Sequence, residues 1–121
     1  MKICVTAEEN NLDSQVDSRF GRCQYFIIFD LETSEFEAID NPDINGMGGV
    51  GIKAGQLMAE KSVEAVLTGN VGPNAFRTLQ AAGIKVITGV SGTVKKAVEK
   101  YRAGGFKSNQ GPSVDSHFGN K

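Results

Sequence analysis

The chain is poor in the side chains that most often perform catalysis or bind metal ions. Its 121 residues include one histidine, His117, and two cysteines, Cys4 and Cys23, which lie too far apart in sequence for a CxxC pair. The sequence has no Ser-His-Asp set and no HExxH motif, and no closely spaced pair of carboxylates lies in an apolar setting. From these absences we expect a protein that is not an enzyme.

A large charge of one sign and long apolar runs are missing as well. The 13 basic and 14 acidic side chains leave a net charge of -1, too little for the electrostatic footprint of a nucleic-acid binder. No stretch approaches the roughly 18 apolar residues of a membrane helix, and a strand begins directly after Met1 without a signal-peptide core. Two isolated thiols fit a reducing compartment. We expect a cytoplasmic protein without nucleic-acid or membrane partners.

Glycine, in contrast, is abundant, with 15 residues in the chain. The glycines cluster between apolar segments and indicate loops with special backbone geometry. A chain of this length is sufficient for one domain with a hydrophobic core. From residue 106 onward small and polar residues dominate, so we expect a single α/β domain over residues 1–103 and a flexible tail over 104–121.

The spacing of apolar residues predicts five strands and three helices. Strands are predicted at residues 3–7, 25–29, 35–39, 66–68 and 84–88. Helices are predicted over residues 54–61, from Pro73 to a stop at Gly83, and over 94–101. The polar segment 8–19 is predicted to be a long exposed loop. This order predicts an α/β fold with a mixed five-stranded sheet of order 3-2-1-4-5, in which strand 2 is antiparallel to strand 1 and helices cover both faces.

A repeated sequence motif indicates a binding role for the predicted sheet. Residues 65–69 and 86–89 each end an apolar run in Thr-Gly just before a helix signal. Such turns place backbone N–H groups along the carboxyl edge of a parallel sheet, where an anion is readily held. Thr6, Thr68 and Thr88 are expected to cluster at this edge. We therefore interpret the chain as a binding protein.

Two arginines are candidates for binding an anion. Arg19 and Arg22 flank Phe20 and Gly21, and a guanidinium group offers donors in a fixed plane to a sulfide-rich or phosphate-bearing anion. Arg19, Phe20, Gly21 and Arg22 are therefore predicted binding residues. The alternative is that both arginines are solvated surface charges.

Two glycine-containing loops are further candidates because each precedes a helix. Gly46, Gly48 and Gly49 open one helix, while Gly69, Asn70 and Gly72 open the next, with Gly72 placed as its N-cap. We predict that these residues and Thr68 contact the ligand. Ordinary turn geometry remains the alternative. The GxxxxGK[ST] motif is absent, so no nucleotide cofactor is assigned.

Cys23 and His117 are the candidate metal ligands. Cys23 follows Arg22, whose charge would lower the pKa of the thiol and favour the thiolate that binds iron. His117 lies in the tail, where it would supply one ligand. The alternatives are an inert buried thiol and a solvent-exposed imidazole.

The tail also repeats part of the loop that carries the arginines. Residues 16–21 and residues 114–119 are identical at five of six positions, with Arg19 replaced by His117. The tail segment would then imitate the loop, competing for the same surface or pairing with it in a neighbouring chain. The alternative is a chance match in a flexible tail.

These segments together resemble a known family. The motif from Arg19 to Arg22 followed by Tyr25 and Phe26, the loop 41–51, and the segment 67–76 are similar to the dinitrogenase iron-molybdenum cofactor biosynthesis family over residues 1 to about 103. The resemblance implies a ribonuclease H-like α/β fold. It also implies non-enzymatic handling of an iron-sulfur or iron-molybdenum cluster or its precursor, by a carrier or by a domain that docks on a cofactor-assembly protein.

The chain departs from the family pattern at two positions. Family members often have His-Phe-Gly-Arg where this chain begins with Arg19, and a His-Gly pair where this chain has Asn45 and Met47. Both changes remove an imidazole, which weakens direct metal ligation. Our leading hypothesis is therefore an anionic metallocluster held as cargo. The alternatives are a protein-interaction or regulatory module of cofactor assembly and a sensor of a phosphorylated small molecule.

Overall fold

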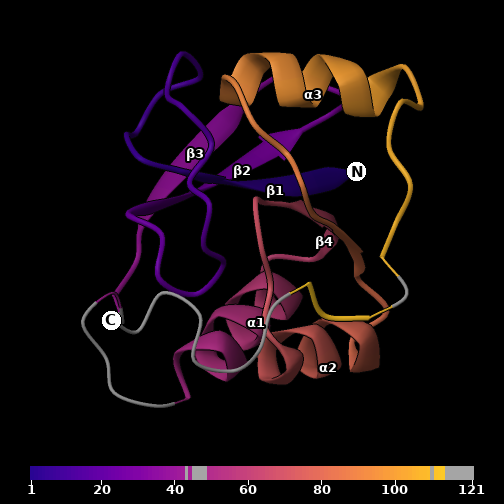
Figure 1. Cartoon of the computed structure of the whole chain (residues 1–121). Helices are drawn as coiled ribbons and strands as arrows, with labels where there is room; N and C mark the ends of the chain where they lie inside the picture. Colours follow the sequence, from indigo (N-terminus) through magenta and orange to yellow (C-terminus); the bar gives the residue numbers. More distant parts are fainter. Residues whose placement is uncertain (43, 45–48, 110, 114–121) are drawn as a thin grey trace.

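All predicted strands and helices are present in the computed structural model, which describes residues 1–42, 44, 49–109 and 111–113. In chain order the elements are β1 (Lys2–Ala7), β2 (Tyr25–Asp30), β3 (Phe36–Asp40), α1 (Val50–Glu60), β4 (Val63–Leu67), α2 (Pro73–Ala81), β5 (Lys85–Ile87) and α3 (Val94–Arg102). The sheet lies between α3 on one face and α1 with α2 on the other (Figure 1). Within the described residues, no helix has the length and apolar character needed to cross a bilayer.

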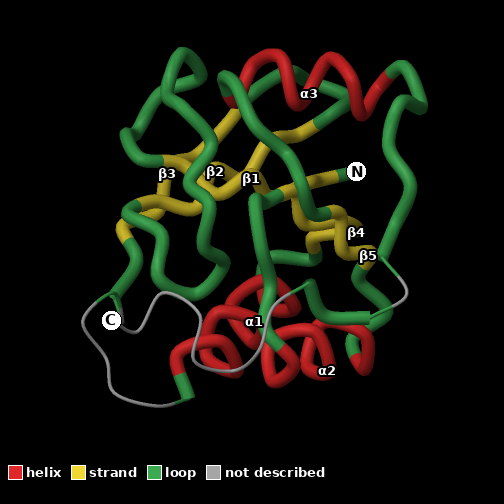
Figure 2. Tube along the Cα trace, viewed as in Figure 1, coloured by secondary structure: helices red, strands yellow, loops and turns green. Residues whose placement is uncertain are grey.

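The sheet has the predicted order, β3-β2-β1-β4-β5. β2 is antiparallel to β1 and β3, whereas β1, β4 and β5 are parallel, so the predicted α/β class and strand directions are confirmed (Figure 2). The ribonuclease H-like name stays a prediction. Because Tyr25 pairs with Ala7, the start of β2 lies at the same edge as the ends of β1, β4 and β5. We call this the carboxyl edge.

Two apolar clusters form the core, one on each face of the sheet. Side chains alternate across a strand, so Cys4 points toward α1 and α2 whereas Ile3 and Val5 point toward α3. Met58 and Leu79 fill the first cluster and are fully buried. Burial on both faces explains why β1 and β4 are nearly continuous apolar runs.

The segment 8–19 differs from the exposed loop that we predicted. Ser14, Val16 and Asp17 are buried, and the Val16 N–H donates to the Gly92 carbonyl at 2.9 Å. The Asp17 N–H donates to the Thr6 carbonyl at 2.8 Å, so the loop returns to the end of β1. Its polar sequence hides this packing because hydrogen bonds of backbone groups to distant segments, which leave no periodic pattern of apolar residues, help to hold it.

The described part of the tail contacts the domain, and its predicted flexibility stays a prediction. Phe106 is half-buried against the α3-side cluster, and the Lys100 Nζ lies 4.7 Å from its ring centroid. Asn109 and Ser113 form hydrogen bonds with the carboxyl edge. Residues 105–109 and 111–113 are therefore attached to the fold, while the domain boundary at residue 103 stays a prediction. Residues 114–121, which include the repeat at 114–119, lie outside the described residues.

Replacing a core side chain of α2 should measure how strongly this helix is held. Leu79 is fully buried, so Leu79→Ala is expected to lower the free energy of unfolding by about 2–5 kcal/mol through lost burial and a residual cavity. Gln80→Ala on the exposed side of the same helix should change it by less than about 0.5 kcal/mol. Urea denaturation followed by circular dichroism measures both, and equal effects would contradict the assigned packing.

Candidate functional site

The arginine loop lies directly against the loop that follows β4. Arg19 forms a parallel β-bridge with Asn70, and the Phe20 N–H donates to the Asn70 carbonyl at 3.1 Å. The approach is close because residue 69 is glycine: a Cβ atom at Gly69 would lie 2.6 Å from the Ser18 Cα. Gly69 is thus needed for the contact between two loops that are distant in sequence.

The same arginine loop also contacts the start of α1. Gly21 has φ +93°, a conformation that favours glycine, and a Cβ atom there would lie 3.2 Å from the Gly51 Cα. Gly51 in turn lies against α2, because its Cβ would be 3.0 Å from the Ala75 Cβ. Three predicted binding segments therefore meet at the carboxyl edge. We call residues 19–22, 49–51 and 69–72 the rim.

Two residues that sequence reasoning missed hold the arginine loop in place. The Asp17 carboxylate is buried and accepts the N–H groups of Arg19 at 3.1 Å and Gln24 at 3.3 Å, and it lies 3.7 Å from the Arg19 Nε. The Asn41 Nδ2 donates to the carbonyls of Gly21 at 2.8 Å and Cys23 at 2.9 Å. An Asp two residues before Arg19 is typical of an Asx turn, a signal that could have identified Asp17. The sequence offers no comparable signal for Asn41.

The rim combines cationic side chains with two helix N-termini. Arg19 and Arg22 are both half-buried. α1 begins at the N-cap Gly49 and α2 at the N-cap Gly72, and neither has a side-chain cap. The first turns, 50–53 and 73–76, are both described and contain no acidic residue. The partial positive charge of each helix N-terminus is therefore available to an anion.

Thr68 lies beneath the rim instead of facing solvent. Thr6 and Thr68 have no exposed surface, and the Thr6 Oγ1 lies 2.8 Å from the Thr68 Oγ1 and 2.7 Å from the Asp17 carbonyl oxygen. Two of the three threonines expected to cluster do so, whereas Thr88 bonds with Asn109. The buried hydroxyls attach the 14–19 loop to the sheet. Thr68 therefore supports the site from below and offers no surface to a ligand.

Cys23 does not have the accessible, activated thiol that we predicted. Its side chain has no exposed surface. Burial raises the pKa of the Cys23 thiol well above its ordinary value, and the neighbouring Cys4 and Asp17 add to the increase. The expected lowering of the Cys23 pKa by Arg22 is therefore wrong, because burial disfavours the charged thiolate and dominates the shift.

Other candidates cannot be placed relative to the rim. Gly46, Gly48 and His117 lie outside the described residues, as do Asn45 and Met47. Among the residues that the structure describes, no group of three His, Cys, Asp or Glu side chains could hold a metal ion.

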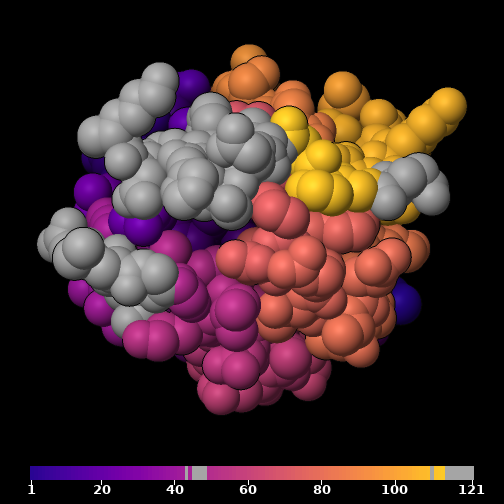
Figure 3. Space-filling model, turned by 60° about the horizontal axis from the view of Figure 1, so that its bottom comes forward, coloured from indigo at the N-terminus to yellow at the C-terminus, as the bar shows by residue number. Residues whose placement is uncertain are grey.

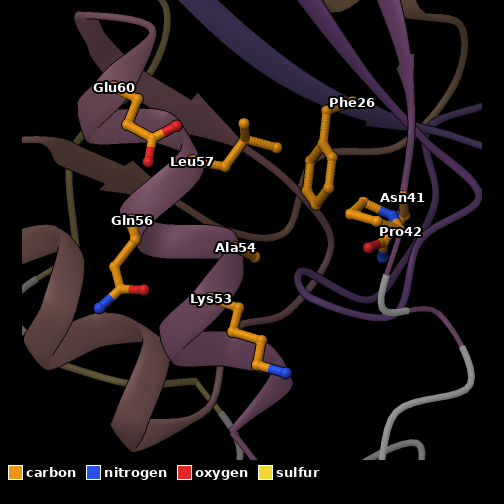
Figure 4. A pocket seen from close by; sticks show the side chains of 8 residues that line it. All are labelled: Phe26, Asn41, Pro42, Lys53, Ala54, Gln56, Leu57 and Glu60. Carbon is orange, nitrogen blue, oxygen red and sulfur yellow. The ribbon is translucent and has the colours of Figure 1, made fainter.

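A cavity of about 200 Å³ lies beside the rim, between α1, the start of β2 and the residues that follow β3 (Figure 4). It is lined by Phe26, Asn41, Pro42, Lys53, Ala54, Gln56, Leu57 and Glu60. Asn41 belongs to both regions, because the same side chain that lines the cavity also binds the carbonyls of the arginine loop. The cavity carries charges of both signs, Lys53 and Glu60, whereas the charged side chains of the rim are arginines.

Comparison with known proteins places the chain in a family. Residues 1–104 match the sequence model of the family described as dinitrogenase iron-molybdenum cofactor. The chain belongs to this family. The resemblance inferred from the motifs is thereby confirmed, and the dinitrogenase iron-molybdenum cofactor family is involved in biosynthesis of that cofactor.

Three relatives of the chain illustrate the likeness. The apo form of the orange protein from Desulfovibrio gigas superposes with a TM-score of 0.90 at 42% identity, covering 93% of this chain and 96% of that one. A Thermotoga protein described as a candidate NifB protein, whose structure was solved by NMR, has a TM-score of 0.74 at 37% identity. The match covers 88% of this chain and 91% of that one. An uncharacterized protein from Methanocaldococcus jannaschii is 32% identical over 107 residues, which are 86% of this chain and 87% of that protein.

Removing the charge of Asp17 should loosen the arginine loop. Hydrogen bonds to a charged acceptor contribute about 1.5–3 kcal/mol, so we expect Asp17→Asn to lower the free energy of unfolding by about that amount. The control is Asp13→Asn, an exposed position in the same segment, with an expected change below about 0.5 kcal/mol. If thermal and urea unfolding give the two variants the same stability, Asp17 does not organise the loop.

Burial should also make both thiols unreactive in the folded protein. Cys4 and Cys23 are buried and free, and burial raises the pKa of each thiol. With a colorimetric disulfide reagent at pH 8, we expect almost no reaction in buffer and two thiols per chain in denaturing urea. Rapid reaction of one thiol in native protein would restore Cys23 as a candidate ligand.

Proposed function

We propose that this protein binds and carries an anionic iron-sulfur or iron-molybdenum cluster, or a precursor of one, without catalysing a reaction. One observation carries the proposal: the arginine loop contacts two other segments at the carboxyl edge. Arg19 pairs with Asn70, and Gly21 lies against Gly51. These contacts bring the backbone of the arginine loop beside the N-termini of α1 and α2. The cluster is the cargo, and it would be exchanged intact.

The donor set of the rim favours a large, diffuse anion. Guanidinium groups are weakly hydrated and present several N–H donors in a plane, which suits the sulfur surface of a cluster. N–H groups at helix N-termini add fixed partial charges without any need for deprotonation. Because Arg19 replaces the imidazole that family members often carry, binding by charge fits this chain better than ligation to a metal.

Family membership supports the same proposal. The family takes its description from the iron-molybdenum cofactor. The related Desulfovibrio gigas protein was solved in an apo form, a term used of proteins that also have a form with a bound group. Carriage is the simplest activity that uses the rim.

A protein-interaction module of cofactor assembly is the second candidate. β3 is an edge strand of the sheet, and Phe36 on it is 42% exposed, which is unusual for an aromatic residue. An assembly protein could add a strand there. Retention of such a partner by Arg19→Gln/Arg22→Gln, together with its loss in Phe36→Glu, would favour this candidate.

A sensor of a phosphorylated small molecule would use the same rim. A ligand at 100 times its dissociation constant should raise the free energy of unfolding by about 2.7 kcal/mol. A thermal-shift screen of nucleotides and sugar phosphates therefore separates this candidate from cluster carriage. An unchanged melting temperature across the screen would exclude it.

Neutralising the arginines should weaken cargo binding. We expect Arg19→Gln and Arg22→Gln each to reduce the affinity for tetrathiomolybdate about tenfold, because each removes a charge-assisted hydrogen bond of about 1.5 kcal/mol. The binding is measured under anaerobic conditions by absorbance titration. In parallel, protein incubated with ferrous iron and sulfide is desalted and its retained iron is measured.

The matched control removes two positive charges from the opposite edge of the sheet. Lys2→Gln/Lys85→Gln changes exposed residues at the starts of β1 and β5, and it should leave binding within about twofold of wild type. An equal loss in the arginine and lysine variants would indicate nonspecific attraction. No retained metal in wild-type protein with either probe would overturn the carrier proposal.

A further inference from the structure

The described part of the tail crosses the carboxyl edge as a strap. We give this name to residues 105–109 and 111–113. Beyond Phe106, the Asn109 N–H donates to the Val86 carbonyl at 2.6 Å, and the Ser113 N–H donates to the Val71 carbonyl at 2.9 Å. The yellow segment in Figure 1 runs from the end of α3 toward α2, Figure 2 shows the same segment beside β5, and Figure 3 shows it on the molecular surface.

Side chains of the strap bind backbone donors at the ends of two parallel strands. The Ser113 Oγ accepts the Val71 N–H at 2.8 Å, and the Asn109 Oδ1 accepts the Thr88 N–H at 3.3 Å. The Asn109 Nδ2 also donates to the Thr88 Oγ1 at 2.8 Å. Val71 follows β4 and Thr88 follows β5, where open α/β sheets bind their ligands.

The two donors belong to neighbouring turns. The Gly89 N–H donates to the Gly69 carbonyl at 2.9 Å, and the Val90 N–H donates to the Thr68 carbonyl at 3.2 Å. The turn after β5 is therefore bonded to the rim segment that follows β4. An anion at the rim would have the Val71 and Thr88 N–H groups beside it if the strap were absent.

We propose that the Val71 and Thr88 N–H groups form a two-donor subsite for an oxoanion or thioanion, with the strap as its internal occupant. The oxygens of Ser113 and Asn109 take the positions of the acceptor atoms of the ligand. This inference rests on the proposed function, because it assigns these donors to the cargo bound at the rim. Binding of cargo then requires the strap to leave.

The strap has few contacts that would make it permanent. Phe106 is its one large apolar side chain and packs against α3, while Lys107, Ser108 and Ser113 are exposed. Its remaining attachments are hydrogen bonds of neutral groups. An anion that accepts the same N–H groups forms stronger, charge-assisted hydrogen bonds. The apparent affinity for the anion is reduced by the fraction of molecules in which the strap covers the subsite.

The test removes the two side chains that imitate the ligand. In Asn109→Ala/Ser113→Ala, the strap loses both acceptors, so binding of tetrathiomolybdate should become at least about tenfold tighter than in wild type. Ser108→Ala, an exposed serine of the same segment, is the control and should bind as wild type does. Circular dichroism verifies that each full-length variant is folded.

A second measurement uses the wild-type chain and does not depend on any variant. Saturating tetrathiomolybdate should accelerate amide hydrogen exchange at Asn109 and Ser113, because their bonds to Val86 and Val71 are released. Unchanged or slower exchange in the bound protein would overturn the inference.

The outcomes separate this inference from the function on which it rests. If wild type binds, Arg19→Gln weakens binding and the double variant binds no more tightly than wild type, the strap is a fixed part of the fold and only the subsite is refuted. If neither wild type nor the double variant binds the probe, both proposals fail. Tighter binding by the double variant together with faster exchange at Asn109 and Ser113 supports the subsite.

Discussion

The hydroxyl group of Thr6 joins the three parts of the chain on which the rim depends. It lies at the end of β1, within hydrogen-bond distance of Thr68 at the end of β4 and of the Asp17 carbonyl in the loop between β1 and β2. All three groups are buried, where an unpaired polar group would be costly and a paired one specifies a single arrangement. These hydrogen bonds attach the arginine loop to the ends of β1 and β4. The Asp17 side chain then stabilises the conformation of the loop.

Close backbone approach brings the remaining segments to that loop. Gly69 admits Ser18, Gly21 admits the first turn of α1, and Gly51 admits α2, so the helices begin beside the arginines. The resulting surface combines two arginines with two helix N-termini, whose charges need no proton release, whereas both thiols are buried in the core. A protein that carries a cluster benefits from this separation, because weak and exchangeable contacts allow the cargo to be passed on.

The strap adds a second feature to this surface. Its neutral oxygens accept hydrogen bonds from the Val71 and Thr88 N–H groups. These donors therefore have partners when no ligand is bound. An anion and the strap then compete for the same donors, so loading of cargo and movement of the tail are linked by mass action.

The sequence by itself determined the sheet order, the strand directions and the start of α2 at Pro73, because apolar periodicity, glycine and proline act within a few residues of chain. α1 begins at Val50, four residues before the predicted start at Ala54. It also brought Arg19, Gly21 and Gly69 forward as candidates, since a glycine-flanked arginine motif is visible locally. Only the tertiary structure decided that Cys23 is buried, that Thr68 faces Thr6, and that Asp17 and Asn41 hold the loop. Burial and long-range hydrogen bonds depend on what covers each residue, and for these residues the covering groups come from segments up to 62 positions away in the chain.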